Sequence, residues 1–146
     1  MEQKGLTAKA SIDIAAKKEK VWDALVNPDL IKEYMFGTQV ISDWKKGSSI
    51  VWKGEWQGKH YEDKGKILEL DPPNHIQYTH YSPLTDIEDE PQNYNTVNIQ
   101  LSTMGEGTKV ELWQDNNVNE KAVEHSTSNW EMILSKLKEL VEEIQY

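Results

Sequence analysis

Hydrophobic and polar residues alternate with a period of two along most of the chain, which predicts a protein built mainly of strands. Residues Leu6–Ala15 alternate in this way, and alternating segments return between Gly37 and Asp115. Six strands are predicted in this second region, separated by the glycine, proline and asparagine residues that favour turns. Their expected ranges are Gln39–Trp44, Ser49–Trp56, Lys59–Leu70, His75–Tyr81, Asn93–Thr103 and Thr108–Asp115.

Three segments show helical periodicity instead. Apolar residues in Lys17–Val26 recur at helical spacing, and Asn27 followed by Pro28 ends that helix because a residue before proline avoids the α region. The same pair can begin a second short helix that runs to about Met35, with Asn27 as its N-cap. A long amphipathic helix is expected over Val118–Ile144. Its four-three spacing also suits a coiled coil, but a single helix that follows six strands is expected to pack on their sheet.

Paired residues of an antiparallel hairpin share one face of a sheet, so the predicted hairpins can be tested against one another. Tight turns at Gln57–Gly58, Asp71–Asn74 and Gly105–Glu106 give mutually consistent faces. The expected pairs are Trp52 with Asp63, Gly54 with Tyr61, Leu70 with His75, Ile67 with Tyr78, Gly65 with His80, Leu101 with Val110, Ile99 with Leu112 and Val97 with Gln114. The predicted inner row is Ile50, Trp52, Tyr61, Asp63, Ile67, Ile76, Tyr78, His80, Val97, Ile99, Leu101, Val110, Leu112 and Gln114.

The opposite row of the same strands is polar and includes Lys64, Lys66, Gln77 and Asn98. Such a pattern is expected of an antiparallel sheet that turns one face to solvent. We therefore predict an α+β fold in a single domain over residues 1–146. In this fold a curved antiparallel sheet of about seven strands wraps around the long C-terminal helix, and two short helices follow the first strand.

Four local phrases occur in a fixed order along the chain. They are VWDAL at Val21–Leu25 followed by Asn27-Pro28, SDWKKG at Ser42–Gly47, GKILELDPP at Gly65–Pro73 and NWEMIL at Asn129–Leu134. With these phrases the chain resembles the activator of heat shock protein 90 ATPase homologue-like family of the START-like (SRPBCC) superfamily. The resemblance implies a helix-grip fold, also called Bet v-like, with a cavity between the sheet and the long helix.

The resemblance does not imply one reaction, because the superfamily includes lipid carriers, hormone receptors, cyclases and bacterial proteins related to stress or antibiotics. One residue departs from the family pattern. Asn129 stands where the family usually has a small residue before the helix tryptophan. We expect this larger side chain to narrow the space between helix and sheet.

Composition excludes several classes of partner. The net charge is −9, and all 16 basic residues are lysines, which cannot form the planar fork that reads guanine or clamps phosphate. Nucleic acid is therefore not expected as a partner. The absence of cysteine excludes disulfides and thiolate chemistry, and no apolar run has the length of a signal peptide or membrane span. We expect a cytoplasmic protein without a membrane partner or cofactor.

Asp63 is the most informative single residue, because the hairpin pairing places a carboxylate on the inner row beside Trp52. In apolar surroundings such a carboxylate can act as a general base or hold a polar group of a ligand. It can equally lie near an open rim and be hydrated. Tyr78 and His80 also point inward, where they can orient a ligand by hydrogen bonds or form part of a satisfied core.

Gln114 is a further polar group of the inner row, and it can either close one end of a cavity or face solvent near a strand end. The predicted ligand contacts are Trp52, Tyr61, Asp63, Tyr78, His80, Gln114, Trp130 and Leu134. Trp44 and Trp56 can join Trp52 and Trp130 in an aromatic cage. Filling of the core is the competing role for Trp22 and Trp130.

No metal site is predicted. His75 and His80 lie five apart on one strand and so face opposite sides, while His60 is on the outer row and His125 has no partner at helical spacing. An acidic segment contains Asp86, Glu88, Asp89 and Glu90, and it can repel anions, bind a hard cation or simply be solvated.

The leading functional hypothesis is binding of a small, mostly apolar or aromatic molecule in the cavity. The first alternative is a co-chaperone that modulates the heat shock protein 90 ATPase, and it rests on the family resemblance. The second alternative is a small cavity enzyme that uses Asp63 with His80. Without a recognisable catalytic motif, a binding protein is preferred over an enzyme.

Overall fold

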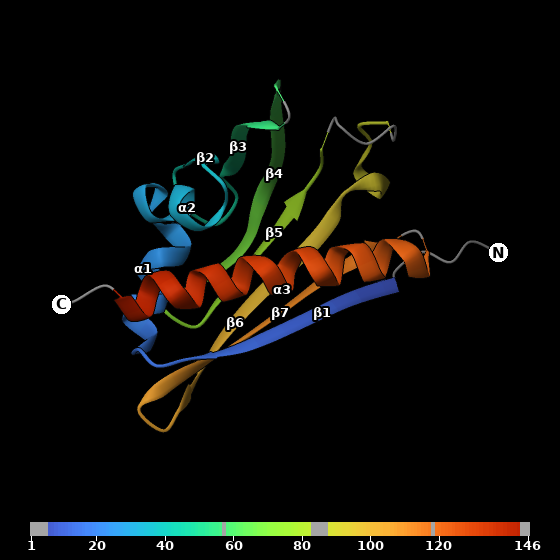
Figure 1. Cartoon of the computed structure of the whole chain (residues 1–146). Coiled ribbons are helices and arrows are strands. Elements are labelled where there is room, and N and C mark those ends of the chain that lie inside the picture. Colours follow the sequence, from blue (N-terminus) through green and yellow to red (C-terminus); the bar gives the residue numbers. More distant parts are fainter. Residues whose placement is uncertain (1–5, 57, 83–87, 118, 144–146) are drawn as a thin grey trace.

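A seven-stranded antiparallel sheet crossed by one long helix forms the protein (Figure 1). The computed structural model describes residues 6–56, 58–82, 88–117 and 119–143. The elements in chain order are β1 (Leu6–Ile14), α1 (Lys18–Val26), α2 (Pro28–Tyr34), β2 (Gln39–Ser42), β3 (Ser49–Trp56), β4 (Lys59–Asp71), β5 (His75–His80), a short 3-10 helix (Pro91–Asn93), β6 (Asn95–Met104), β7 (Gly107–Asn117) and α3 (Glu120–Glu143). The predicted α+β helix-grip fold is confirmed.

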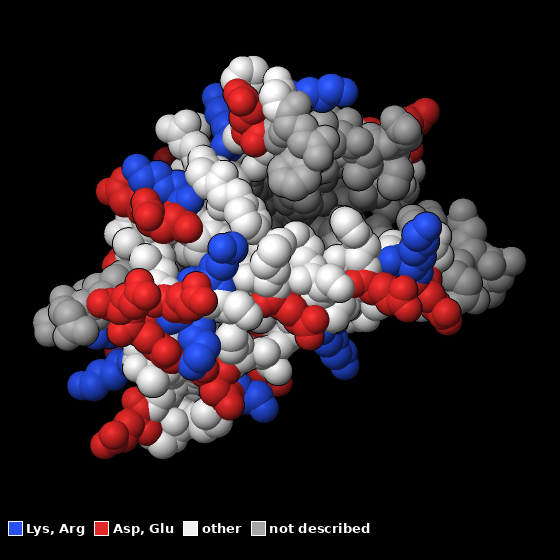
Figure 2. Space-filling view, viewed as in Figure 1, with Lys and Arg blue, Asp and Glu red and all other residues white. Residues whose placement is uncertain are grey.

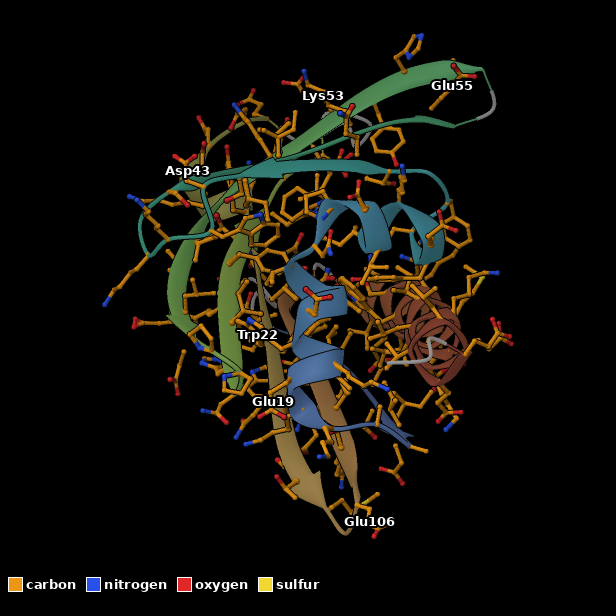
Figure 3. All side chains as sticks on the ribbon, turned by 90° about the vertical axis from the view of Figure 1, so that its left-hand side faces the viewer. Glu19, Trp22, Asp43, Lys53, Glu55 and Glu106 are labelled. Atoms are coloured by element: carbon orange, nitrogen blue, oxygen red, sulfur yellow. The ribbon has the colours of Figure 1, made fainter. Side chains whose placement is uncertain are left out.

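The strands lie in the order β1-β7-β6-β5-β4-β3-β2, and every neighbouring pair is antiparallel. Figure 1 shows α3 across one face of this sheet, with α1 and α2 at one end of the same face. Figure 3 looks toward that end, where Glu55 and Glu106 mark the tips of two long hairpins on opposite sides of the molecule. The curved sheet and the three helices thus surround one interior.

The junction of α1 and α2 follows from Asn27 and Pro28 as predicted. The side-chain oxygen of Asn27 accepts a hydrogen bond from the backbone N–H of Asp29 at 3.0 Å, and Pro28 occupies the first turn of α2. An asparagine cap satisfies one of the free N–H groups at a helix start, and proline has no N–H to leave unsatisfied there. The chain therefore turns sharply between the two helices and brings both over the sheet.

The core lies between the inner row of the sheet and the apolar stripe of α3. This stripe contains Ile133, Leu134, Leu137 and Val141, all of which are buried. All eight aliphatic residues of the predicted inner row are buried as well, and burial of each such side chain contributes roughly 1.5–3 kcal/mol. The helix therefore packs on the sheet, and the alternative coiled coil is not required to cover its apolar face.

The pairing of β4 with β5 differs from the prediction near its turn. Ile67 lies opposite Tyr78 as expected, but Leu70 lies opposite Ile76, and His75 pairs with Asp71 instead. The turn closes over three residues, and a bulge between Ile67 and Glu69 absorbs the extra residue. The turn is one residue shorter than predicted, so the pairing next to it is shifted by one residue. The predicted pair Leu70–His75 is therefore wrong.

Two polar side chains also differ from expectation. Asn98, predicted on the solvent face, is buried, and its side-chain oxygen lies 3.0 Å from Nε2 of His75 on the neighbouring strand. Asn129 is exposed on α3 and does not narrow the space under the helix. Successive residues of an α-helix are rotated by about 100°, so Asn129 points away from the direction of Trp130. The expected steric effect of Asn129 is therefore wrong.

Candidate functional site

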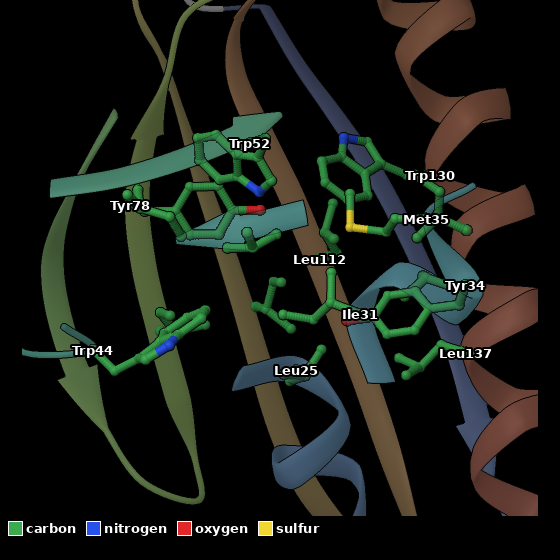
Figure 4. A pocket seen from close by; sticks show the side chains of 16 residues that line it. Leu25, Ile31, Tyr34, Met35, Trp44, Trp52, Tyr78, Leu112, Trp130 and Leu137 are labelled. Carbon is green, nitrogen blue, oxygen red and sulfur yellow. The ribbon is translucent and has the colours of Figure 1, made fainter. Parts of the chain in front are cut away.

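An apolar pocket lies between the concave face of the sheet and α3 (Figure 4). All three helices and five of the strands contribute to its wall, together with Trp44 from the turn after β2. The lining residues are Leu25, Ile31, Tyr34, Met35, Val40, Trp44, Ile50, Trp52, Ile76, Tyr78, Ile99, Leu112, Trp130, Ile133, Leu134 and Leu137. None of them carries a charge, so the pocket suits a mostly apolar molecule.

The free volume of this pocket is about 40 Å³. Established ligand pockets usually have about 300–1,000 Å³, whereas each water-sized probe needs only about 10–15 Å³. In this conformation side chains therefore fill most of the interior. A ligand larger than a few heavy atoms can enter only if some of these side chains move.

Trp52 on β3 and Tyr78 on β5 bring two polar groups to the pocket. The side chains are 6% and 8% exposed, and their ring centroids are 5.2 Å apart. Figure 4 shows the indole nitrogen of Trp52 and the hydroxyl of Tyr78 directed into the pocket. Within the described residues neither group makes a hydrogen bond. Burial raises the pKa of the Tyr78 hydroxyl well above its usual value, so the hydroxyl keeps its proton.

Tyr34 on α2 also lines the pocket but uses its hydroxyl differently. The Tyr34 hydroxyl donates a hydrogen bond to the carbonyl oxygen of Ala24 at 2.9 Å. This contact joins α2 to α1 and satisfies the buried group. Burial again raises the pKa of the hydroxyl, with the nearby Tyr78 as a smaller cause.

Asp63 and His80 form a pair next to Trp52 but outside the pocket lining. Nε2 of His80 donates to Oδ2 of Asp63 at 2.9 Å, and the two side chains are 31% and 15% exposed. The ring of His80 meets the face of Trp52 edge-on, with centroids 5.0 Å apart. The other carboxylate oxygen, Oδ1 of Asp63, is buried and has no hydrogen-bond partner among the described residues. Neither residue lines the pocket, although His80 packs against the wall residue Trp52.

Gln114 on β7 holds the tryptophan of α3. Nε1 of Trp130 donates to Oε1 of Gln114 at 2.7 Å, while Nε2 of Gln114 lies 3.5 Å from Ser126 Oγ and from Asn117 Oδ1. Asn117 in turn donates to the carbonyl of Leu6 at 2.9 Å. The glutamine thus belongs to a polar network that joins helix and sheet and orients a wall residue of the pocket.

Tyr61 contacts Thr38, in the segment between α2 and β2, rather than the pocket. Thr38 donates its hydroxyl proton to the carbonyl of Met35 at 2.6 Å, so the Tyr61 hydroxyl, 2.7 Å away, acts as donor to Thr38. The ring of Tyr61 lies over Gly54, where an added Cβ would come within 2.4 Å of its hydroxyl oxygen. Tyr61 therefore stabilises the segment that carries Met35.

Four of the eight predicted contact residues line the pocket. They are Trp52, Tyr78, Trp130 and Leu134. Trp44 lines it too, whereas Trp22 belongs to the core, and the side chain of Trp56 lies outside the part of the structure that is described. Sequence reasoning missed the contribution of α2, although Ile31, Tyr34 and Met35 have the spacing of one helix face.

Among the described residues, no three histidine, aspartate or glutamate side chains are arranged to hold a metal ion. In the acidic segment, Asp86 lies outside these residues. Asp89 accepts hydrogen bonds from Lys64 and Tyr94, and both hold the pKa of its carboxyl below the usual range. On the face that carries α3, acidic and basic side chains are interspersed (Figure 2). No helix in the described part of the chain is long and apolar enough to cross a membrane.

Comparison with models of protein families identifies the family of this chain. The model of the family described as Activator of Hsp90 ATPase homolog 1-like protein matches residues 15–142. The chain belongs to this family. The resemblance seen in the sequence is thereby confirmed, and the helix-grip fold is the START-like fold of the family. A search of curated proteins finds no match.

Several solved structures share the fold. Protein ChR145 from Cytophaga hutchinsonii is 55% identical, with 94% of each chain covered and a TM-score of 0.83. The Aha1 dimer from Colwellia psychrerythraea is 22% identical over 94% of this chain and 97% of that one, with a TM-score of 0.73. CalU16 from Micromonospora echinospora is 20% identical over 95% and 85%, with a TM-score of 0.69. The last two show likeness of fold alone.

Proposed function

We propose that the protein binds a small, mostly apolar molecule in the pocket between the sheet and α3. The supporting observation is an uncharged pocket with two polar groups, on Trp52 and Tyr78, that no described residue satisfies. Buried polar groups in proteins usually have partners, because an unpaired one costs about 1–3 kcal/mol. A ligand would bury its apolar surface against the wall and supply the missing partner.

Binding requires the pocket to expand from its volume of about 40 Å³. Met35 and Trp130 lie on the same side of the pocket in Figure 4, where α2 faces α3. Methionine is unbranched and adapts its shape readily, and α2 has only seven residues. Movement of Met35 and the end of α2 away from α3 is therefore the proposed route of entry.

A titration with N-phenyl-1-naphthylamine, a neutral apolar fluorophore, tests this function. Wild-type protein is expected to bind the fluorophore and increase its emission. Leu134→Phe, which adds volume at the pocket wall, should weaken binding at least about tenfold, since overfilling a packed interior costs roughly 1–3 kcal/mol. Leu140→Phe is the matched control, because Leu140 lies on the same helix and does not line the pocket. Absence of binding, or equal binding by both variants, would overturn the proposal.

A second candidate function is modulation of a heat shock protein 90 ATPase, as the description of the matching family suggests. It predicts that the full chain increases the ATPase rate of a bacterial chaperone of this type and elutes with it in gel filtration. Neither effect depends on an open pocket, so Leu134→Phe should leave both unchanged. A chaperone whose rate and elution volume do not respond to the chain would eliminate this candidate.

A catalytic role for the pair Asp63–His80 is favoured by their 2.9 Å contact, which is within reach of proton transfer. Neither residue lines the pocket, so neither is placed to contact a molecule bound there. An enzyme of this kind would need a substrate that gains access to the buried Oδ1 of Asp63. Turnover of a bound compound that is lost in Asp63→Asn, with the fold and the affinity retained, would support catalysis over binding alone.

A further inference from the structure

The polar groups of Trp52 and Tyr78 differ in the hydrogen bonds that they can make. An indole N–H is a donor only, whereas a tyrosine hydroxyl can donate or accept. The partner of Trp52 must therefore be an acceptor. Tyr78 can donate to the same atom, because its buried hydroxyl remains protonated at neutral pH.

The sheet brings these two donors together from strands that are not neighbours. Trp52 on β3 pairs with Asp63 on β4, and Tyr78 on β5 pairs with Ile67, which is also on β4. Trp52 and Tyr78 therefore both lie on the inner row, with β4 between their strands. Their rings are in contact, and both polar ends are directed into the pocket (Figure 4). Each side chain is more than nine-tenths buried.

We propose that the ligand carries one neutral acceptor oxygen, such as the carbonyl of a ketone, aldehyde or ester, held between the Trp52 indole N–H and the Tyr78 hydroxyl. This inference rests on the proposed function and names the chemical class of the ligand. The rest of the molecule is apolar, because the remaining wall is almost entirely hydrocarbon and aromatic ring.

The absence of charged residues from the described pocket wall favours a neutral carbonyl over a carboxylate as the acceptor. No lysine or histidine lines the wall, and the whole chain has a net charge of −9. A carboxylate would lose its hydration there without gaining a counter-ion, which is far more costly than burial of a carbonyl that receives hydrogen bonds. Two other polar side chains of the wall are already bonded to protein, Tyr34 to Ala24 and Trp130 to Gln114, and do not compete for the ligand.

Acetophenone and α-methylstyrene are suitable probes, because they have the same shape and differ in C=O against C=CH₂. They are titrated into the uniformly ¹⁵N-labelled full chain, with the Trp52 indole signal assigned through Trp52→Phe. Acetophenone is expected to bind about tenfold more tightly, which corresponds to about 1.4 kcal/mol from the two hydrogen bonds together. The Trp52 indole proton should move downfield with acetophenone only.

Two tyrosine variants test which hydroxyl group produces the preference for acetophenone. Tyr78→Phe should reduce the preference for acetophenone to about threefold, because the Trp52 donor remains, and leave the affinity for α-methylstyrene within about twofold of wild type. Tyr34→Phe is the matched control, since it removes a hydroxyl from the same pocket that is already bonded to protein. This control should keep the preference for acetophenone.

The outcomes separate the inference from the proposed function. Equal affinities for the two probes, with an unmoved Trp52 indole signal, would overturn the carbonyl inference and leave apolar binding in place. Failure of both probes to bind would overturn both. The indole signal is read in wild-type protein, so the inference stays testable even if Tyr78→Phe does not fold.

Discussion

The indole N–H of Trp130 on α3 donates to the side-chain oxygen of Gln114 on β7 at 2.7 Å. This hydrogen bond spans the interface between helix and sheet and holds one wall of the pocket. The partners of Gln114 on the other side, Ser126 and Asn117, continue the network along the same interface. A polar residue of the inner row thus orients an aromatic ring rather than facing solvent.

Replacement of Gln114 by Leu should destabilise the protein by about 1–2 kcal/mol, because the half-buried Trp130 N–H then loses its acceptor. Urea unfolding followed by far-UV circular dichroism measures this change. In a double-mutant cycle with Trp130→Phe, the combined loss should be smaller than the sum of the two single losses. Strict additivity would show that the hydrogen bond contributes nothing to stability.

Replacement of His80 by Phe should cost about 2 kcal/mol of unfolding free energy. The new ring can keep the edge contact with Trp52, but the Asp63 carboxylate loses its donor while its other oxygen is already unpaired. Adding Asp63→Leu to His80→Phe should recover most of the loss, since no unpaired charge remains. A cost below about 0.5 kcal/mol for His80→Phe would mean that water hydrates Asp63 and that the pair is not structural.

Glu142 near the end of α3 should make stability depend on pH. Its Oε2 accepts hydrogen bonds from the Ala15 backbone N–H at 2.8 Å and from Lys138 at 2.5 Å, and both lower the pKa of its carboxyl below the usual 4.5. The folded state therefore favours the ionised form. The resulting stability is fully present above about pH 4.5 and is lost as the pH falls through the lower folded value.

Comparison of Glu142→Gln with wild type tests this dependence. The variant should be less stable by about 1 kcal/mol at pH 7, a figure reduced for solvent exposure, and the difference should shrink toward zero near pH 3. Glu139→Gln on the exposed face of α3 controls for the change in net charge. A difference that stays constant between pH 7 and pH 3 would contradict the role of the ionised carboxylate.

Gly65 on β4 should tolerate no side chain. A Cβ there would lie 1.7 Å from the backbone carbonyl oxygen of Thr79 on β5, so Gly65→Ala forces two strands apart and should cost about 3 kcal/mol or more. Gly105→Ala is the comparison, because Gly105 has a φ of +60° but no neighbouring atom within 4 Å. Thermal unfolding should show a loss of only about 1–2 kcal/mol for this turn variant. Equal losses would show that β4 and β5 can separate easily.

Much of the fold was predictable because its signals are local. The period of two, the turn residues and the junction at Asn27 and Pro28 located the three α-helices and the seven strands to within a few residues. The hairpin test also assigned the inner row correctly, including Trp52 opposite Asp63 and Val97 opposite Gln114. It failed where a bulge changed the register, because a bulge depends on how one strand fits its neighbour.

The candidate site was predictable only in part. Inward direction could be read for Trp52, Tyr78, Asp63 and His80, yet only the first two line the pocket. Asp63 and His80 share this face but lie outside the lining, because parity gives the face of a residue and not its position along the strand relative to the pocket. The α2 residues of the wall, Met35 among them, were missed because nothing local indicates which part of the sheet a short helix will cover.

By itself the sequence determined which residues form each element and which face of each element is apolar, because periodicity and turn chemistry act between near neighbours. The tertiary structure alone decided which inward polar groups find partners. Gln114 meets Trp130, Tyr34 meets Ala24 and Asp63 meets His80, whereas Trp52 and Tyr78 converge on the pocket without a bond to any described residue. Hydrogen bonds form over about 3 Å, and only the packing of distant segments sets distances that short.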